Sequence, residues 1–257
     1  MEICILAGGT GTRLREMTEL LPKALIPIGN KPMIFHIMQT YAYCGHKDFI
    51  LALGYKQEQF KEYFNNFSII NNDISIVVGL SKSLIYYDFI GDGWKVTLSD
   101  TGLNTLKGGR LKRIEKYVKG DTFLLTYGDG LSNININELI NFHYSHGKLV
   151  TVTGVHPIPR FGEIRREGSV VQSFSEKPDD NNYLINGGYY VMNRGVFDYL
   201  CEDANCDLEI GALEKIASEG QMEVYEHKGF WRCIDTLQDL GDIQQRWDLN
   251  DAPWKVW

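Results

Sequence analysis

The feature that most constrains the fold is a short apolar stretch that runs directly into a glycine-rich turn, Ile5-Leu6-Ala7-Gly8-Gly9-Thr10-Gly11-Thr12-Arg13. Glycine reaches positive φ and carries no side chain, so the backbone N–H groups of such a turn can surround phosphate oxygens. The spacing differs from that of the G-x-x-x-x-G-K-[ST] loop, and Leu14 stands where a dinucleotide-binding turn has its third glycine. The pattern predicts a mononucleotide phosphate loop, although a plain strand-to-helix turn has the same local sequence.

Apolar periodicity divides the first part of the chain into alternating strands and helices. It predicts strands over residues 2–6 and 48–53 and helices over residues 31–43 and 57–65, an order that favours a parallel sheet. Further strands are predicted over residues 74–78, 123–126, 149–155, 170–174 and 188–192, with helices near 137–146, 194–200 and 210–219. We therefore expect an α/β fold, Rossmann-like and three-layered, in which helices flank a mixed, mostly parallel sheet that the second-half strands extend.

Composition limits the classes of protein to which the chain can belong. Its 257 residues contain no Pro/Ser/Gly-rich linker, which favours a single domain over residues 1–257. The net charge of −7 argues against general nucleic-acid binding, and the apolar runs are too short to cross a membrane. Because the N-terminus reads as a core strand and the five scattered cysteines lack paired metal-site spacing, we expect a cytoplasmic protein with reduced thiols.

Further motifs follow the glycine-rich turn in a fixed order. Residues 21–33 read Leu-Pro-Lys-Ala-Leu-Ile-Pro-Ile-Gly-Asn-Lys-Pro-Met, and later come Ser175-Glu176-Lys177-Pro178 and Ile185-Asn186-Gly187-Gly188-Tyr189. Together these segments resemble the motifs of the sugar-1-phosphate nucleotidyltransferases, whose fold is of the nucleotide-diphospho-sugar transferase type. The resemblance implies that Lys177 neutralises the phosphate of an acceptor and that Asn186 and Gly187 contact the rest of it. It also implies a nucleotide-binding half, residues 1–130, and an acceptor-binding half, residues 131–257.

Two aspartates have the placement expected of a phosphoryl-transfer site. Asp129 follows an apolar stretch, and Asp235 precedes a helical segment, although either could merely cap a turn. Ligands of open α/β sheets bind at the carboxyl ends of the strands, where these carboxylates can converge. Because Mg²⁺ prefers oxygen ligands, Asp129 and Asp235 are the predicted metal ligands. Lys23 and Arg13 would neutralise charge on the α-phosphate and the leaving pyrophosphate, so the predicted catalytic residues are Lys23, Arg13 and Asp129.

Other segments narrow the resemblance to the branch of the family that uses CTP. These segments are residues 97–102, 108–113, 126–130, 229–231, 235–237 and 252–255. The resemblance implies transfer of CMP from CTP to a phosphorylated acceptor, in the first place glucose 1-phosphate, by a homo-oligomer. It implies base and ribose contacts from Thr105 and Arg110. The predicted nucleotide-binding residues are Leu6, Ala7, Gly8, Gly9, Thr10, Gly11, Thr12, Arg13, Lys23, Thr105, Arg110 and Gly128.

Three departures from the family pattern fall where the acceptor would be recognised. Residues 21–25 lack the first lysine and the second proline of the usual K-P-K-P-M stretch. Lys107 stands where a threonine is usual, and the acidic-proline motif is replaced near residues 209–213. A different acceptor therefore stays open, either another sugar 1-phosphate or a non-sugar phosphate such as phosphoglutamine.

Functions from other classes of protein have less support. A nucleotide sensor without catalysis would not need the four charged site residues together, and a dinucleotide-dependent oxidoreductase would need the missing third glycine. Residues 81–95 form the most irregular stretch, and we expect either a lid or an oligomer contact there. The aromatic side chains of Trp94, Tyr86 and Tyr87 could stack on the base or the acceptor, but packing in a core or a subunit interface is favoured.

Overall fold

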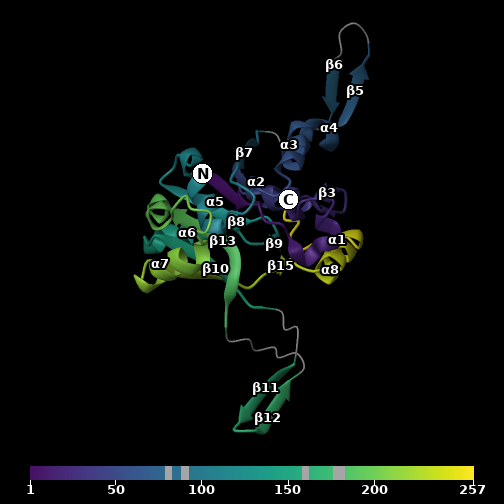
Figure 1. The fold of residues 1–257 in the computed structure, drawn as a ribbon. Coiled ribbons are helices and arrows are strands. Elements are labelled where there is room, and N and C mark those ends of the chain that lie inside the picture. Colours follow the sequence, from purple (N-terminus) through teal and green to yellow (C-terminus); the bar gives the residue numbers. More distant parts are fainter. Residues whose placement is uncertain (79–82, 88–92, 158–161, 176–182) are drawn as a thin grey trace.

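A central sheet orders its strands β14-β10-β13-β8-β1-β4-β7 in the computed structural model, which describes residues 1–78, 83–87, 93–157, 162–175 and 183–257 (Figure 1). These strands span Glu2–Leu6 (β1), Asp48–Leu53 (β4), Lys95–Asp100 (β7), Thr122–Tyr127 (β8), Val150–Val155 (β10), Ile185–Asn193 (β13) and Met222–His227 (β14). The pairs β1–β4, β1–β8, β4–β7 and β10–β14 are parallel, whereas β13 runs antiparallel to both β8 and β10. The sheet is thus mixed and mostly parallel, as predicted.

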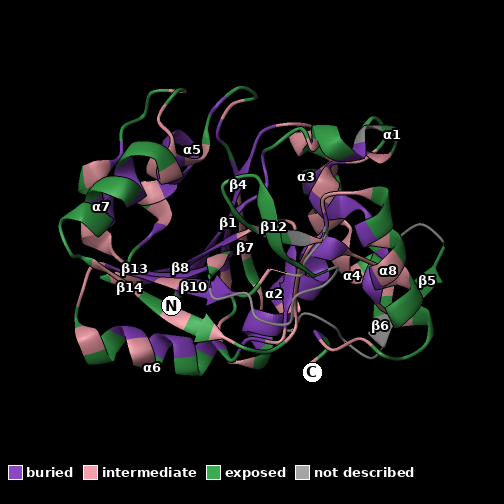
Figure 2. Ribbon diagram, turned by 90° about the horizontal axis from the view of Figure 1, so that it is seen from below, coloured by how far each residue is buried: buried purple, intermediate pink, exposed green. Residues whose placement is uncertain are grey.

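Helices cover both faces of the sheet. Figure 2 shows α5 and α7 on one side and α2 and α6 on the other. Alternate side chains of β1 enter two separate cores, with Ile3 and Ile5 in one and Cys4 and Leu6 in the other. The helices span Arg15–Thr18 (α1), Met33–Tyr43 (α2), Gln57–Asn65 (α3), Phe67–Asn71 (α4), Lys107–Ile114 (α5), Ile136–His146 (α6), Glu214–Ser218 (α7) and Leu237–Asp248 (α8). The three-layer α/β expectation is confirmed.

Two hairpins project from the body of the molecule (Figure 1). One consists of Asp73–Val77 (β5) and Ser83–Tyr87 (β6), and the other of Glu163–Glu167 (β11) and Val170–Ser175 (β12). The expectation that the predicted strand over 170–174 extends the main sheet is therefore wrong. Its apolar side chains indicated burial, but Val171 and Phe174 are 56% and 63% exposed because the strand pairs only with its own hairpin partner.

Short elements complete the chain and correct some predicted boundaries. The helix predicted from residue 31 begins at Met33, because Lys31–Pro32 (β3) pairs with Pro27–Ile28 (β2). The helix predicted over 210–219 is interrupted at Gly211, whose φ of +107° is a conformation that glycine favours. The remaining elements are Gly130–Ser132 (β9), Trp231–Cys233 (β15), Thr12–Leu14 (η1), Lys23–Leu25 (η2), Glu115–Tyr117 (η3), Arg194–Tyr199 (η4) and Leu208–Leu213 (η5).

Several other expectations can be compared with the described residues. Trp94 packs against Phe35, Phe49 and Phe67, with ring centroids 5.4–5.7 Å away, so it belongs to a core. All five cysteines are free. Within the described ranges, no helix is both long and apolar enough to cross a membrane. The main sheet takes strands from both predicted halves, 1–130 and 131–257, and that division stays a prediction.

A buried histidine on α2 fastens the C-terminal residues to the core. The His36 side chain contacts the Ile28 carbonyl oxygen through Nε2 at 3.1 Å, and Trp254 Nε1 donates to its Nδ1 at 3.4 Å. Indole N–H can only donate, so Nδ1 carries no proton and Nε2–H donates to Ile28. Burial lowers the pKa of His36 from 6.5 to about 4, because a charged imidazolium is disfavoured away from water.

We predict that the free energy of unfolding falls as the pH drops from about 6.5 to about 4, where the unfolded chain binds a proton that folded His36 rejects. The contribution is at most about 3 kcal/mol. His36→Gln keeps a donor for Ile28 but cannot titrate, so urea unfolding at pH 7 and pH 4.5 should show a smaller difference in this variant. Exposed His156→Gln is the control, and equal pH dependence in the wild type and His36→Gln would contradict the prediction.

Candidate active site

The predicted phosphate loop lies at the edge of the sheet where β1, β4 and β8 end. Gly128 N donates to Leu6 O, and Ala7 N donates to Ala52 O, both at 3.1 Å, so the three strand ends are held side by side. A Cβ on Gly128 would meet Ala24 and Ala7 Cβ atoms at 3.2 and 3.3 Å, so this close approach favours glycine. A cavity of about 550 Å³ opens over this edge.

Arg110 connects the glycine-rich turn to neighbouring loops through hydrogen bonds. Arg110 is 4% exposed, and its Nη1 and Nη2 groups lie within hydrogen-bond distance, 2.7–3.0 Å, of five acceptor oxygens, four of which are backbone carbonyl oxygens. Its acceptors are the carbonyl oxygens of Gly8, Leu53, Gly102 and Leu103 and the hydroxyl of Thr101. A Cβ on Gly8 would lie 2.2 Å from Arg110 Nη1, so the guanidinium packs directly against the glycine-rich turn.

Four charged side chains meet at the mouth of this cavity. Lys23 Nζ lies 2.7 Å from both Asp129 Oδ2 and Asp235 Oδ1, and Arg13 Nη1 lies 2.6 Å from Asp235 Oδ2. The β9–β15 pairing brings the two aspartates together, since Ile234 N donates to Asp129 O at 3.0 Å. Two positive and two negative charges therefore balance at one place.

Local structure fixes each member of this cluster. Lys23 begins the short turn η2, so its backbone is held although its ammonium can reach the cavity. Asp235 precedes the capping box of α8, in which the side chains and backbone of Thr236 and Asp239 bond reciprocally. Asp239 Oδ2 also accepts from Asp235 N at 3.2 Å. The Asp235 carboxylate is thereby fixed at a helix entry rather than in a free loop.

The ion pairs change the protonation of Lys23 and Asp235. Burial acts to lower the pKa of the Lys23 ammonium, but the charge of Asp129 and the hydrogen bonds to both aspartates outweigh it and raise that pKa. Burial acts to raise the pKa of Asp235, but the hydrogen bond and charge of Lys23, helped by Arg13, lower it. Both groups are therefore firmly charged at neutral pH.

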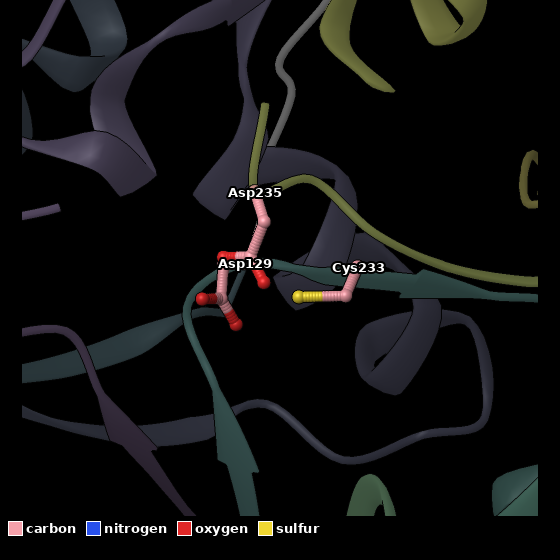
Figure 3. Close-up of side chains that lie close together, drawn as sticks. All are labelled: Asp129, Cys233 and Asp235. Atoms are coloured by element: carbon pink, nitrogen blue, oxygen red, sulfur yellow. The ribbon is translucent and has the colours of Figure 1, made fainter. Parts of the chain in front are cut away.

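Asp129, Cys233 and Asp235 form the group best placed to hold a metal ion. Figure 3 shows the three side chains turned toward one another, and one potential ligand atom of each lies within 4.8 Å of the others. Cys233 was not predicted, yet it stands two residues before Asp235, and alternate residues of an extended chain share a face. Burial and the nearby carboxylates raise the pKa of the Cys233 thiol, so the oxygen ligands dominate.

The other predicted site residues are distributed unequally around the cavity. All predicted nucleotide-binding residues except Thr10 and Thr12 line it, as do Asn186 and Gly187. Thr105 Oγ1 accepts from Arg113 Nη1 at 2.8 Å. Lys177 lies outside the described residues. The proposed roles of all these residues stay predictions.

Several residues line the cavity that were not predicted to belong to it. They include Leu106, Tyr127 and Trp231, whereas Lys107, which also lines the cavity, was already expected near the acceptor. Tyr127 could have been found because it directly precedes Gly128 and Asp129 at the end of a strand. Trp231 gives no such signal, since its position depends on the pairing of β15 with β9.

Comparison with known proteins gives a consistent result. The family model "Nucleotidyl transferase" matches residues 3–251. The chain is 42% identical over 259 residues to a probable glucose-1-phosphate cytidylyltransferase of Bacillus subtilis and 42% identical over 258 residues to the glucose-1-phosphate cytidylyltransferase of Salmonella typhi, each covering 100% of both chains. A solved putative glucose-1-phosphate thymidylyltransferase of Bacillus anthracis shares the fold, with a TM-score of 0.69, 21% identity and coverage of 95% and 94% of the two chains.

We predict that Arg110→Lys destabilises the protein by about 3 kcal/mol, because a lysine cannot serve five buried acceptors in a fixed fork. Urea unfolding at pH 7 measures the change. The control is Arg246→Lys, since Arg246 forms an exposed pair with Asp251 and its replacement should change stability by less than about 1 kcal/mol. Equal losses of stability in the two variants would show that the hydrogen bonds of Arg110 contribute no more than an exposed ion pair.

Proposed function

The chain belongs to the nucleotidyl transferase family, and on that premise we propose that it transfers CMP from CTP to glucose 1-phosphate, giving CDP-glucose and pyrophosphate. The observation that carries the proposal is the convergence of Lys23, Arg13, Asp129 and Asp235 at the cavity. The choice of CTP and of glucose 1-phosphate is supported by the full-length similarity to proteins of that name. The cytoplasmic location and the homo-oligomer stay predictions.

The donor set suits Mg²⁺. Asp129 and Asp235 supply carboxylate oxygens, the ligands that Mg²⁺ prefers, and these oxygens lie within 4.8 Å of one another. When bound, the ion would neutralise phosphate charge and help to align the triphosphate. Lys23 forms ion pairs with the same two carboxylates.

The reaction needs no protein nucleophile. A non-bridging oxygen of the acceptor phosphate forms a bond to the α-phosphorus of CTP. The bond between the α-phosphorus and the oxygen that bridges the α- and β-phosphates breaks. The electron pair leaves with pyrophosphate. A phosphate monoester is largely dianionic at neutral pH, so no strong general base is required. Catalysis then rests on alignment and on preorganised positive charge.

The residues of this chain have distinct tasks in that scheme. The backbone of Gly8, Gly9 and Gly11 borders the cavity and can surround phosphate oxygens. Lys23 is 14% exposed and stands between the two carboxylates, from where its ammonium can neutralise charge that develops on the α-phosphate. The Arg13 side chain is 74% exposed, so it can move to contact the β- and γ-phosphates and can stay with pyrophosphate as that product leaves.

We predict CTP-dependent pyrophosphate release with glucose 1-phosphate, and its loss when EDTA removes divalent metal. The assay compares CTP, UTP, dTTP, ATP and GTP, each with glucose 1-phosphate, other sugar 1-phosphates and phosphoglutamine. The absence of pyrophosphate release from CTP with every acceptor in the panel would contradict the proposal and favour a nucleotide sensor. Restoration by added Mg²⁺ is the control for the EDTA measurement.

We predict that Lys23→Met lowers kcat by about 100-fold, the cost of removing one preorganised charge from a transition state. The matched control is Lys95→Met, since Lys95 also pairs with an aspartate, Asp48, but away from the cavity. Lys23 lowers the pKa of Asp235, so the stability that the variant loses should be largest above the ordinary pKa of an aspartate and should shrink as the pH falls through the lowered pKa of Asp235. Turnover near that of the wild type in a folded variant would sink the proposed role.

A further inference from the structure

Two departures from the family pattern, far apart in sequence, contact each other in the structure. Lys107 is the first residue of α5, and its Nζ forms an ion pair with Glu209 Oε1 in η5. Lys107 lines the cavity, whereas Glu209 is not among the described residues that line it. The ammonium is therefore at the cavity wall, with a carboxylate behind it.

A chain of polar contacts connects this ion pair to a residue predicted to bind the acceptor. Tyr127 OH donates to Glu209 Oε1 at 2.6 Å and lies 3.0 Å from Tyr190 OH. Asn186 Nδ2 donates to Tyr190 OH at 2.5 Å, and its Oδ1 accepts from Gly188 N at 2.8 Å. The Asn186 amide is thus already hydrogen-bonded. A continuous series of polar contacts connects it through Tyr190 and Tyr127 to Glu209.

Within this series of polar contacts, the Lys107 ammonium has N–H donors that no described residue accepts. Its ammonium has three N–H donors, and one is used by Glu209. The same ammonium lies 5.2 Å from the centroid of the Tyr127 ring, which restricts its stem. Two charged donors thus remain for a ligand in the part of the cavity that Tyr127, Asn186 and Gly187 border.

The carboxylate behind Lys107 is held there at a cost in stability. Glu209 Oε2 is buried and has no hydrogen-bond partner among the described residues. An unmade hydrogen bond at a buried acceptor disfavours the folded state. Asp207 Oδ1 nevertheless accepts from the backbone N–H groups of Glu209 and Ile210, at 2.9 and 2.8 Å, and holds this segment in place. A buried acceptor without a partner is a feature that proteins commonly show at functional sites.

We infer that Lys107 is a specificity-determining residue that donates hydrogen bonds to the ring hydroxyl oxygens of a sugar phosphate acceptor, with Glu209 as its positioning residue. The inference rests on the proposed function and deepens it by selecting the acceptor class. Glu209 cancels the Lys107 charge, so an anionic substituent gains little attraction there. The ammonium of a phosphorylated amino acid cannot reach Glu209, which lies behind the wall. A neutral, hydroxyl-bearing acceptor therefore fits better than phosphoglutamine.

The test compares Lys107→Thr, which restores the residue usual in the family pattern, with Lys148→Thr. Lys148 also forms an ion pair with a glutamate, Glu223, but on the far edge of the sheet, and is the matched control. At saturating CTP, Lys107→Thr should raise the KM for glucose 1-phosphate about tenfold, the value of one hydrogen bond to a charged group. Its kcat and its KM for CTP should change less than about twofold, because phosphoryl transfer is not touched.

A second measurement identifies the hydroxyl that Lys107 contacts. The 2-, 3-, 4- and 6-deoxy analogues of glucose 1-phosphate are assayed with the wild type and with Lys107→Thr. At least one analogue should raise the wild-type KM about tenfold and raise it no further in the variant, because the same hydrogen bond is lost only once. Glu209→Gln should show the same selectivity in weaker form, with the KM for CTP unchanged.

The outcomes separate this inference from the proposed function. Wild-type turnover of CTP and glucose 1-phosphate, with an unchanged acceptor KM in Lys107→Thr, would overturn the inference alone. So would an increased KM for CTP, which would assign Lys107 to the nucleotide, or a wild-type preference for phosphoglutamine. Silence of the wild type with every acceptor would overturn both. If Lys107→Thr does not fold, Lys107→Met replaces it in the same assays, because methionine keeps an apolar stem over the Tyr127 ring.

Discussion

Strand β1 lies between β4 and β8, and its carboxyl end determines where the loops around the cavity can lie. The register sets Leu6 beside both Ala52 and Tyr127, so the glycine-rich turn and the Asp129 segment leave the sheet side by side. Apolar side chains alternate into two cores on opposite faces of the sheet, which fixes this register, because a slip by one residue would exchange the faces. The chemistry at the edge thus depends on packing within the sheet.

The four charged side chains at the cavity compensate one another. Lys23 and Arg13 are compensated by Asp129 and Asp235, so no buried charge lacks a partner in this group. Two cationic and two anionic side chains are thus held within hydrogen-bond distance of one another at one edge of the sheet.

Much of the site could be predicted because strand ends of a parallel sheet meet at one edge, which places Asp129 beside the glycine-rich turn. The pairing of Lys107 with Glu209 could not, since it depends on the path of an irregular segment with no periodic pattern. The wrong placement of β12 has a similar cause, because apolar alternation does not distinguish a core strand from a projecting hairpin. Arg110 was expected to contact the nucleotide, whereas its visible hydrogen bonds go to the protein itself.

The hydrogen bonds of Arg110 also determine which substitutions the surrounding loops can accept. Four of its five acceptors are carbonyl oxygens, which every residue possesses. The side chains at positions 53 and 103 can therefore change without removing an acceptor, whereas Gly8 cannot gain a Cβ without displacing the guanidinium. The hydrogen bonds of Arg110 are thus independent of the side chains at positions 53 and 103, so evolution can replace those side chains while the connection between the loops is kept.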